Sequence, residues 1–376
     1  MTARKAPPLE VLRHAFEGIA DEMSKTLHRS AYTVVIKDSN DFSCALFDTD
    51  GALVAQGSNA PTHLGSMSYA LKDLIEFWGN DVRPGDVFIS NDPYRGGTHL
   101  PDVHIFMPVF DAERRFAWAG NIAHHGDWGG RVPGSISVQN RSVYEEGVIY
   151  PHVRLESEGR PHRDIYQLLA ANVRQPTLGL GDLRAQVASA KTAVERTRAL
   201  LTRYRVDVLA DGMRALIASA EARARKQIEA LPDGTYHAAG FLDGNGLPGS
   251  EPLPIVVHLT VAGSDVTVDF AGTAPQQETA INIPVATTRS AVMFALRTLL
   301  DPSIPSNEGC YRPLRLRLPE ASLVNPAKPA PVSDRHITSQ RLADVLLRAF
   351  AQLDETALTA GWFVGSAWMS CFPPSP

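Results

Sequence analysis

The feature that most constrains the fold is a pair of apolar segments, each bordered by a polar, glycine-rich loop. Residues 103–110 and 115–122 are typical of β-strands, and only residues 111–114 separate them. Strands joined by so short a connection pair in antiparallel fashion. The loops at 91–102 and 121–130 are then expected to meet at the open end of this hairpin.

The polar side chains of the two loops are therefore expected to converge. Counting outward from the middle of the connection places Asp102 opposite Ala123. Directly paired side chains lie roughly 4.5–5.5 Å apart in an antiparallel ladder. The residues that this pairing brings together are His99, Asp102, His124, His125 and Asp127.

Imidazoles and carboxylates grouped in this way suit a divalent first-row metal ion that keeps open positions for a substrate. A single histidine is more commonly a surface or hydrogen-bonding residue, and glycines in such loops are commonly turn residues. What favours a metal site is the grouping of these side chains at the paired ends of one hairpin.

The rest of the chain alternates helical and strand-like segments, which predicts a mixed α+β fold. Apolar residues recur at helical spacing over 9–31, Asp50-Gly51 predicts the turn of another hairpin, and 164–230 is strongly helical. A Pro-Asp-Gly turn marks the expected boundary between two domains. The first, 1–232, holds the β-hairpins, long helices and metal loops, and the second, 233–376, is strand-rich.

Composition and charge exclude several classes of protein. The formal net charge of −5 argues against a general nucleic-acid binder, whose affinity rests on neutralising phosphates. No stretch approaches the roughly 20 apolar residues of a membrane helix, and the first thirty residues lack the apolar core of a signal peptide. The three cysteines are too few for a disulfide framework. We therefore expect a cytoplasmic protein with neither nucleic acid nor membrane as partner.

Motifs of nucleotide and nucleophile chemistry are weak or missing. The sequence has no G-x-x-x-x-G-K-[ST] phosphate loop and no G-x-S-x-G nucleophile elbow. Residues 244–249 fit G-x-G-x-x-G, but they contain Pro248 and lead toward a strand. A dinucleotide fingerprint needs a strand before it and a helix after it.

A series of segments, in order along most of the chain, resembles the hydantoinase B/oxoprolinase family. The long loop motif Asn91–Asp102 is the most specific of them. The others are Asp41–Asp48, His63–Met67, His124–Gly130, Asn172–Arg174, Gly181–Gln186, Asp269–Gly272, Pro305–Pro313 and Thr338–Arg341.

The resemblance implies an enzyme subunit: the B-type half of an ATP-dependent hydrolase of cyclic amides, of the hydantoinase or 5-oxoprolinase type. A hydantoinase A-type partner subunit would bind ATP and phosphorylate the substrate, and this chain would complete the hydrolysis. Two alternatives share the same loops. One is a subunit of an ATP-dependent ketone carboxylase of the acetone carboxylase type, and the other is a truncated, non-catalytic paralogue that only assembles with a partner.

The resemblance also implies roles for individual residues. A divalent metal, manganese or zinc, would be held by a His-x-x-Asp pair and a later histidine, here His99, Asp102 and His124. His125 and Asp127 are then candidates for proton transfer. Arg95 and the backbone of Gly96 and Gly97 are candidates for holding a phosphate or carboxylate group.

The sequence departs from the family pattern in two places. Asp334-Arg335-His336 stands where a turn containing asparagine is more typical. The tail, 361–376, does not resemble the glycine-rich region with which the family usually continues. We therefore expect the C-terminal region, 233–376, to be incomplete.

Overall fold

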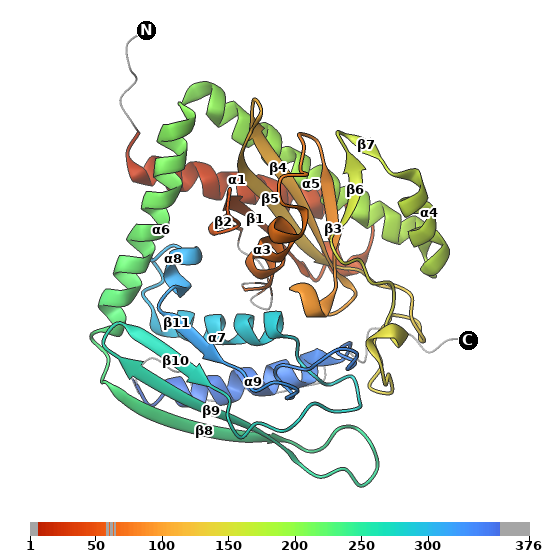
Figure 1. The fold of residues 1–376 in the computed structure, drawn as a ribbon, viewed down its shortest axis with the longest axis vertical. Helices are drawn as coiled ribbons and strands as arrows, with labels where there is room; N and C mark the ends of the chain where they lie inside the picture. The colour runs from red at the N-terminus through yellow and green to blue at the C-terminus, as the bar shows by residue number, and fades with distance from the viewer. Residues whose placement is uncertain (1–6, 58–59, 61–62, 64, 354–376) are drawn as a thin grey trace.

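The structure, a computed structural model, describes residues 7–57, 60, 63 and 65–353. It is a mixed α+β fold, as predicted, with two β-sheets and helices packed against each of them (Figure 1). The larger sheet has the strand order β2-β1-β5-β4-β3-β6-β7, and its neighbouring strands are antiparallel. Its strands are β1 Phe42–Asp48, β2 Leu53–Gln56, β3 Val87–Ser90, β4 Asp102–Asp111, β5 Arg114–His124, β6 Val153–Ser157 and β7 Arg160–Pro161.

The predicted hairpin is present as β4 and β5, but its register differs from the expected one. The ladder is interrupted between Val109 and Phe110, where Phe116 of β5 has no partner in the pairing. This β-bulge adds one residue to β5, so every pair beyond it moves by one position. The expectation that Asp102 lies opposite Ala123 was therefore wrong: Asp102 pairs with His124.

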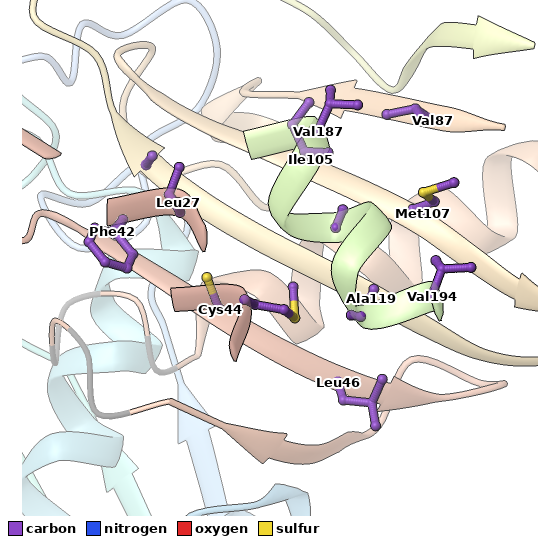
Figure 2. Close-up of a cluster of buried hydrophobic side chains, with 14 of the residues drawn as sticks. Leu27, Phe42, Cys44, Leu46, Val87, Ile105, Met107, Ala119, Val187 and Val194 are labelled. Carbon is purple, nitrogen blue, oxygen red and sulfur yellow. The ribbon is translucent and has the colours of Figure 1, made fainter. Parts of the chain in front are cut away.

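Helices cover both faces of the larger sheet. The amphipathic helix predicted at the N-terminus is α1, Leu9–Ser30, and it packs beside α5, Pro176–Arg203, on one face. Figure 2 shows the buried layer between α5 and the sheet, with Val187 and Val194 of the helix facing apolar strand residues that include Cys44, Leu46, Ile105, Met107 and Ala119. The opposite face packs against α3, Ser66–Trp78, through an aromatic cluster of Phe47, Phe88, Phe106 and Trp118.

The helical segment predicted over 164–230 is confirmed as three helices. They are α4 Arg163–Asn172, α5 Pro176–Arg203 and α6 Val206–Ile228. Pro176 stands in the first turn of α5, where a missing backbone N–H costs least. In Figure 1, α6 (green) runs from the larger sheet to the smaller one. Short helical turns elsewhere are α2 Val34–Lys37, η2 Pro93–Arg95 and η3 Val143–Glu145.

The smaller sheet follows α6 and has the order β11-β10-β9-β8. Its strands are β8 Gly234–Leu242, β9 Leu253–Ala262, β10 Asp265–Asp269 and β11 Leu314–Arg317. The helices in this part of the chain are α7 Val285–Leu299, α8 Glu308–Tyr311 and α9 Arg335–Phe350. Alternate residues of β9 are buried, as expected for a sheet that is covered on one face. The helix α9 packs on β8 and β9. The division into domains at 232/233 stays a prediction.

Two further expectations concern the membrane and the tail. Among the residues that the structure describes, no helix combines the length and the apolar character needed to cross a membrane. The cytoplasmic location stays a prediction. The tail at 361–376 lies outside the described residues.

Candidate metal centre

Three of the predicted residues converge at the open end of the β4–β5 hairpin. Asp102 begins β4 and His124 ends β5, and the bulge places them directly opposite each other. His99 precedes Asp102 in a tight turn, in which the Asp102 amide donates to the His99 carbonyl at 3.0 Å. We refer to these residues as the His99–Asp102–His124 cluster.

The donor atoms of the cluster face one another. Asp102 Oδ1 lies 2.9 Å from His124 Nδ1 and 3.2 Å from His99 Nε2, and the two nitrogens are 3.1 Å apart. One ligand atom from each residue therefore lies within 4.8 Å of the others. The side chains of His99 and Asp102 are buried, and that of His124 is 11% exposed.

The second oxygen of Asp102 is already occupied. Asp102 Oδ2 accepts hydrogen bonds from Thr98 Oγ1 and from Nη2 of Arg335, a residue of the first turn of α9. These two donors orient the carboxylate so that Oδ1 is presented to the imidazoles. Arg335 belongs to the helix that packs on the smaller sheet, so the site combines residues of the larger sheet with one from the helix that covers the smaller sheet.

A backbone carbonyl orients His99. Its Nδ1 lies 2.9 Å from the Ser333 carbonyl oxygen, which can only accept a hydrogen bond. The proton of a neutral His99 therefore sits on Nδ1, and the lone pair sits on Nε2, which faces Asp102 and His124. Metal-ligating histidines commonly donate their other ring N–H to a carbonyl or carboxylate in this way.

Burial and neighbouring charges set the ionisation of the cluster. Burial, with Arg335 adding to it, lowers the pKa of His99 to about 4. Burial opposes ionisation of Asp102, but its interactions with the neighbouring His99, Arg335 and His124 outweigh burial and hold the Asp102 pKa well below its usual range. Burial lowers the pKa of His124, but its hydrogen bond to Asp102 outweighs this and the net shift is upward.

This donor set fits a divalent metal ion. It offers imidazole nitrogens and one ionised carboxylate oxygen, a combination that suits zinc and other first-row metals. The Nε2 lone pair of His99 is already turned toward the other two donors. Metal binding at His124 Nδ1 would have to displace a proton, as is usual for protein ligands.

His125 and Asp127 lie away from these donors. His125 directly follows the last residue of β5. Its ring packs on Trp128, and its Nε2 donates a 2.9 Å hydrogen bond to Oε1 of Gln186 in α5. Asp127 accepts hydrogen bonds from the amides of Gly129 and Gly134, and pairs with Arg174. These contacts hold loop 126–134 in place, and the proton-transfer role stays a prediction.

The predicted substrate-binding residues make structural contacts. Arg95 Nε donates to Asp73 at 2.8 Å. A Cβ added to Gly96 would lie 2.4 Å from Ala70 Cα, so this glycine lets the loop approach α3. A Cβ added to Gly97 would lie 2.5 Å from the Asn91 carbonyl oxygen. Binding of a phosphate or carboxylate here stays a prediction.

Sequence reasoning missed the residues that hold the three ligand side chains in position. Thr98, Ser333 and Arg335 all contact its members directly. His63 is buried nearby, with Nδ1 3.0 Å from Ser43 Oγ. The only signal for Arg335 was that Asp334-Arg335-His336 departs from the family pattern; nothing in the sequence connected that departure to Asp102.

Comparison with known proteins agrees with the resemblance noted in the sequence. The family model described as hydantoinase B/oxoprolinase matches residues 7–373. A protein of Pseudomonas sp. (strain NS671), provisionally named as the B-type subunit of a D-/L-hydantoinase, is 34% identical, over 95% of this chain and 63% of its own length. The 5-oxoprolinase 1 of Arabidopsis thaliana is 31% identical, over 91% of this chain and 29% of its own. The chain thus spans less than two thirds of these relatives.

Two solved structures share the fold. The ATP-dependent caprolactamase from Pseudomonas jessenii matches with a TM-score of 0.90 and 31% identity, over 94% of this chain and 61% of that one. Nucleotide-free acetone carboxylase matches with a TM-score of 0.85 over 93% of this chain and 48% of that one, but at 19% identity it shows likeness of fold alone. Together with the match of the family model over residues 7–373, these similarities show that the chain belongs to the hydantoinase B/oxoprolinase family.

Proposed function

We propose that this chain supplies the hydrolytic half of an ATP-dependent cyclic-amide hydrolase of the hydantoinase and 5-oxoprolinase type. The observation that carries the proposal is the convergence of His99 Nε2, Asp102 Oδ1 and His124 Nδ1 at the buried end of one hairpin. The family supports the reaction class, because its members include proteins named as 5-oxoprolinases and as an ATP-dependent caprolactamase.

In this proposal ATP is used by a hydantoinase A-type partner subunit, which phosphorylates the cyclic amide. Two observations support such a division. The sequence holds no G-x-x-x-x-G-K-[ST] phosphate loop, and a relative at 34% identity is named as the B-type member of a hydantoinase. This chain would then receive the activated substrate and complete opening of the ring.

His99, Asp102 and His124 would hold a divalent metal, manganese or zinc. When bound, such an ion supplies Lewis-acid polarisation of a substrate oxygen or lowers the pKa of a water molecule. The chain's own residues prepare the site. Thr98 and Arg335 turn Asp102 Oδ1 toward the imidazoles.

The alternatives are less well supported. A ketone carboxylase would use the same residues, but acetone carboxylase is similar at the level of fold, whereas the caprolactamase is also 31% identical in sequence. A non-catalytic assembly role does not require converging ligand atoms in a buried site. We therefore favour hydrolysis of a cyclic amide.

The test is to co-express the chain with an A-type subunit and to measure substrate-dependent ATP turnover and ring opening. Hydantoin, 5-oxoproline and caprolactam serve as cyclic amides, and acetone with bicarbonate as the carboxylase substrate. We expect turnover with at least one cyclic amide, lost in a His99→Ala variant and kept in His237→Ala, which removes an exposed histidine of β8. Turnover with acetone alone, or assembly without any turnover, would contradict the proposal.

A further inference from the structure

A buried glutamate is linked to the His99–Asp102–His124 cluster through the backbone at Ser333. Glu146 follows η3 and is fully buried. Its Oε1 accepts hydrogen bonds from two consecutive backbone amides, those of Val332 at 2.6 Å and Ser333 at 2.8 Å. Oε2 is also buried and has no hydrogen-bond partner within the described part of the chain. The hydrogen bonds of this side chain therefore all go to the backbone turn at 332–333.

That turn is the one that orients His99. The Ser333 amide donates to Glu146, and the Ser333 carbonyl accepts from His99 Nδ1 at 2.9 Å. The Ser333 hydroxyl is held in addition by Asn140 Nδ2 at 3.1 Å. Glu146 and Asn140 belong to the loop that follows β5, whereas Ser333 precedes α9. The Ser333 carbonyl that contacts His99 is thus held in place by residues of the loop that follows β5, a strand of the larger sheet.

The position of this carbonyl decides which ring nitrogen of His99 carries the proton. With the carbonyl in place, the proton sits on Nδ1 and Nε2 offers its lone pair to a metal. If the carbonyl moved away, Nδ1–H would be a buried donor without an acceptor, which is an unfavourable state. The other tautomer would avoid this cost by donating from Nε2 to Asp102 Oδ1, 3.2 Å away. In that state Nε2 cannot act as a ligand.

We propose that Glu146 is a positioning residue that holds the Ser333 carbonyl and thereby keeps His99 in the tautomer that can bind a metal. The metal part of this inference rests on the proposed function, but the tautomer does not. A carboxylate is a costly group at this place, since burial raises the pKa of Glu146 to about 8.

The experiment measures the tautomer and metal binding separately. The ¹⁵N resonances of the His99 ring, assigned with a His99→Gln variant, report the tautomer in metal-free protein, and competition with a chromophoric chelator gives the Zn²⁺ dissociation constant. The variants are Glu146→Ala, which removes the acceptor, and Glu146→Gln, whose amide oxygen keeps it. Glu156→Ala is the matched control, because Glu156 is another buried carboxylate, on β6, where it pairs with Lys191.

We expect Nδ1–H in the wild-type protein and a shift toward Nε2–H in Glu146→Ala. We also expect Glu146→Ala to bind Zn²⁺ more weakly, by up to the roughly 10- to 100-fold that is usual when the hydrogen-bond partner of a metal-ligating side chain is lost, because the Ser333 carbonyl is that partner of His99. Glu146→Gln is expected to restore both properties, and Glu156→Ala to lower the melting temperature without changing either.

Three outcomes would overturn the inference: Nε2–H in the wild-type protein, an unchanged tautomer in Glu146→Ala, or equal weakening by Glu156→Ala. The first outcome is measured on the wild-type protein, so it can overturn the inference even if Glu146→Ala does not fold. If the tautomer responds as expected but the wild-type protein binds no Zn²⁺, the positioning role is supported and the proposed metal site fails.

Discussion

Asp102 and His124 stand directly opposite each other across the β4–β5 ladder, because a bulge adds one residue to β5 beyond Phe110. Directly paired residues place their side chains on the same face of a sheet. Without the bulge Asp102 would lie opposite Ala123, and a shift of one residue would turn the His124 ring to the other face. A single backbone irregularity about seven residues away along the strand thus decides whether the two side chains meet.

The Asp102–Arg335 pair is expected to stabilise the fold. Arg335 is 5% exposed, so Asp102→Ala leaves a buried cation without its carboxylate. Removing one partner of a buried ion pair costs about 3–5 kcal/mol in free energy of unfolding. Chemical denaturation of metal-free protein should show this loss for Asp102→Ala. The double variant Asp102→Ala/Arg335→Met should recover a large part of it, and losses that simply add would contradict the pairing.

Metal content should depend on His99. Wild-type protein incubated with Mn²⁺ or Zn²⁺ and then desalted is expected to retain about one ion per chain by elemental mass spectrometry, because the donors of the cluster lie within 4.8 Å of one another. His99→Ala, with two of the three donors left, should retain little. The matched control is His237→Ala, which removes an exposed histidine of β8. Equal metal content in wild-type and His99→Ala protein would exclude this site.

A methyl group at position 97 should disturb the cluster through the backbone. A Cβ on Gly97 would lie 2.5 Å from the Asn91 carbonyl oxygen, too close for any real contact. The loop that carries His99 must therefore move, and we expect Gly97→Ala to lower stability by about 1–3 kcal/mol and to weaken Zn²⁺ binding. Gly126→Ala serves as the control, since nothing lies within 4 Å of its added Cβ. Similar binding constants for the two variants would contradict the prediction.

The ionisation of Glu146 should make stability depend on pH. Burial raises its pKa to about 8 from an ordinary value of 4.5. Between these values the folded protein holds a proton that the unfolded chain has lost, so stability decreases as pH rises, and no further decrease arises above pH 8. Glutamine cannot ionise. The free energy of unfolding of Glu146→Gln relative to wild type should therefore rise with pH in this window, by up to about 1.4 kcal/mol per unit. A difference independent of pH would show that the Glu146 pKa is not raised.

Much of the architecture could be predicted from short-range signals. Helical spacing located α1 and the three helices from α4 to α6, and the Asp50-Gly51 turn located the β1–β2 hairpin. Strands with little apolar character were missed, such as β8, which begins Gly-Thr-Tyr-His, and β11, which alternates leucine and arginine. Their strand conformation depends on pairing with β9 and β10, which lie elsewhere in the chain.

The site was predicted in part. The convergence of His99, Asp102 and His124 is confirmed as geometry, although the expected register was wrong. Treating His124 and His125 as neighbours in one site was not sufficient, because His125, which follows the end of β5, hydrogen-bonds Gln186 of α5. The expected roles of Arg95, Gly96 and Gly97 stay predictions, and their contacts in the structure are with α3 and the adjacent backbone.

The sequence by itself determined the long helices, the β1–β2 and β4–β5 hairpins and the meeting of the two polar loops, because periodicity, turn residues and a short hairpin connection act over a few residues. Only the tertiary structure decided which side chains face one another. The bulge sets the face of His124, Arg335 reaches Asp102 from 233 positions along the chain, and Glu146 holds the carbonyl that orients His99. These relationships depend on how two sheets pack together, and packing over such separations leaves no local pattern in the sequence.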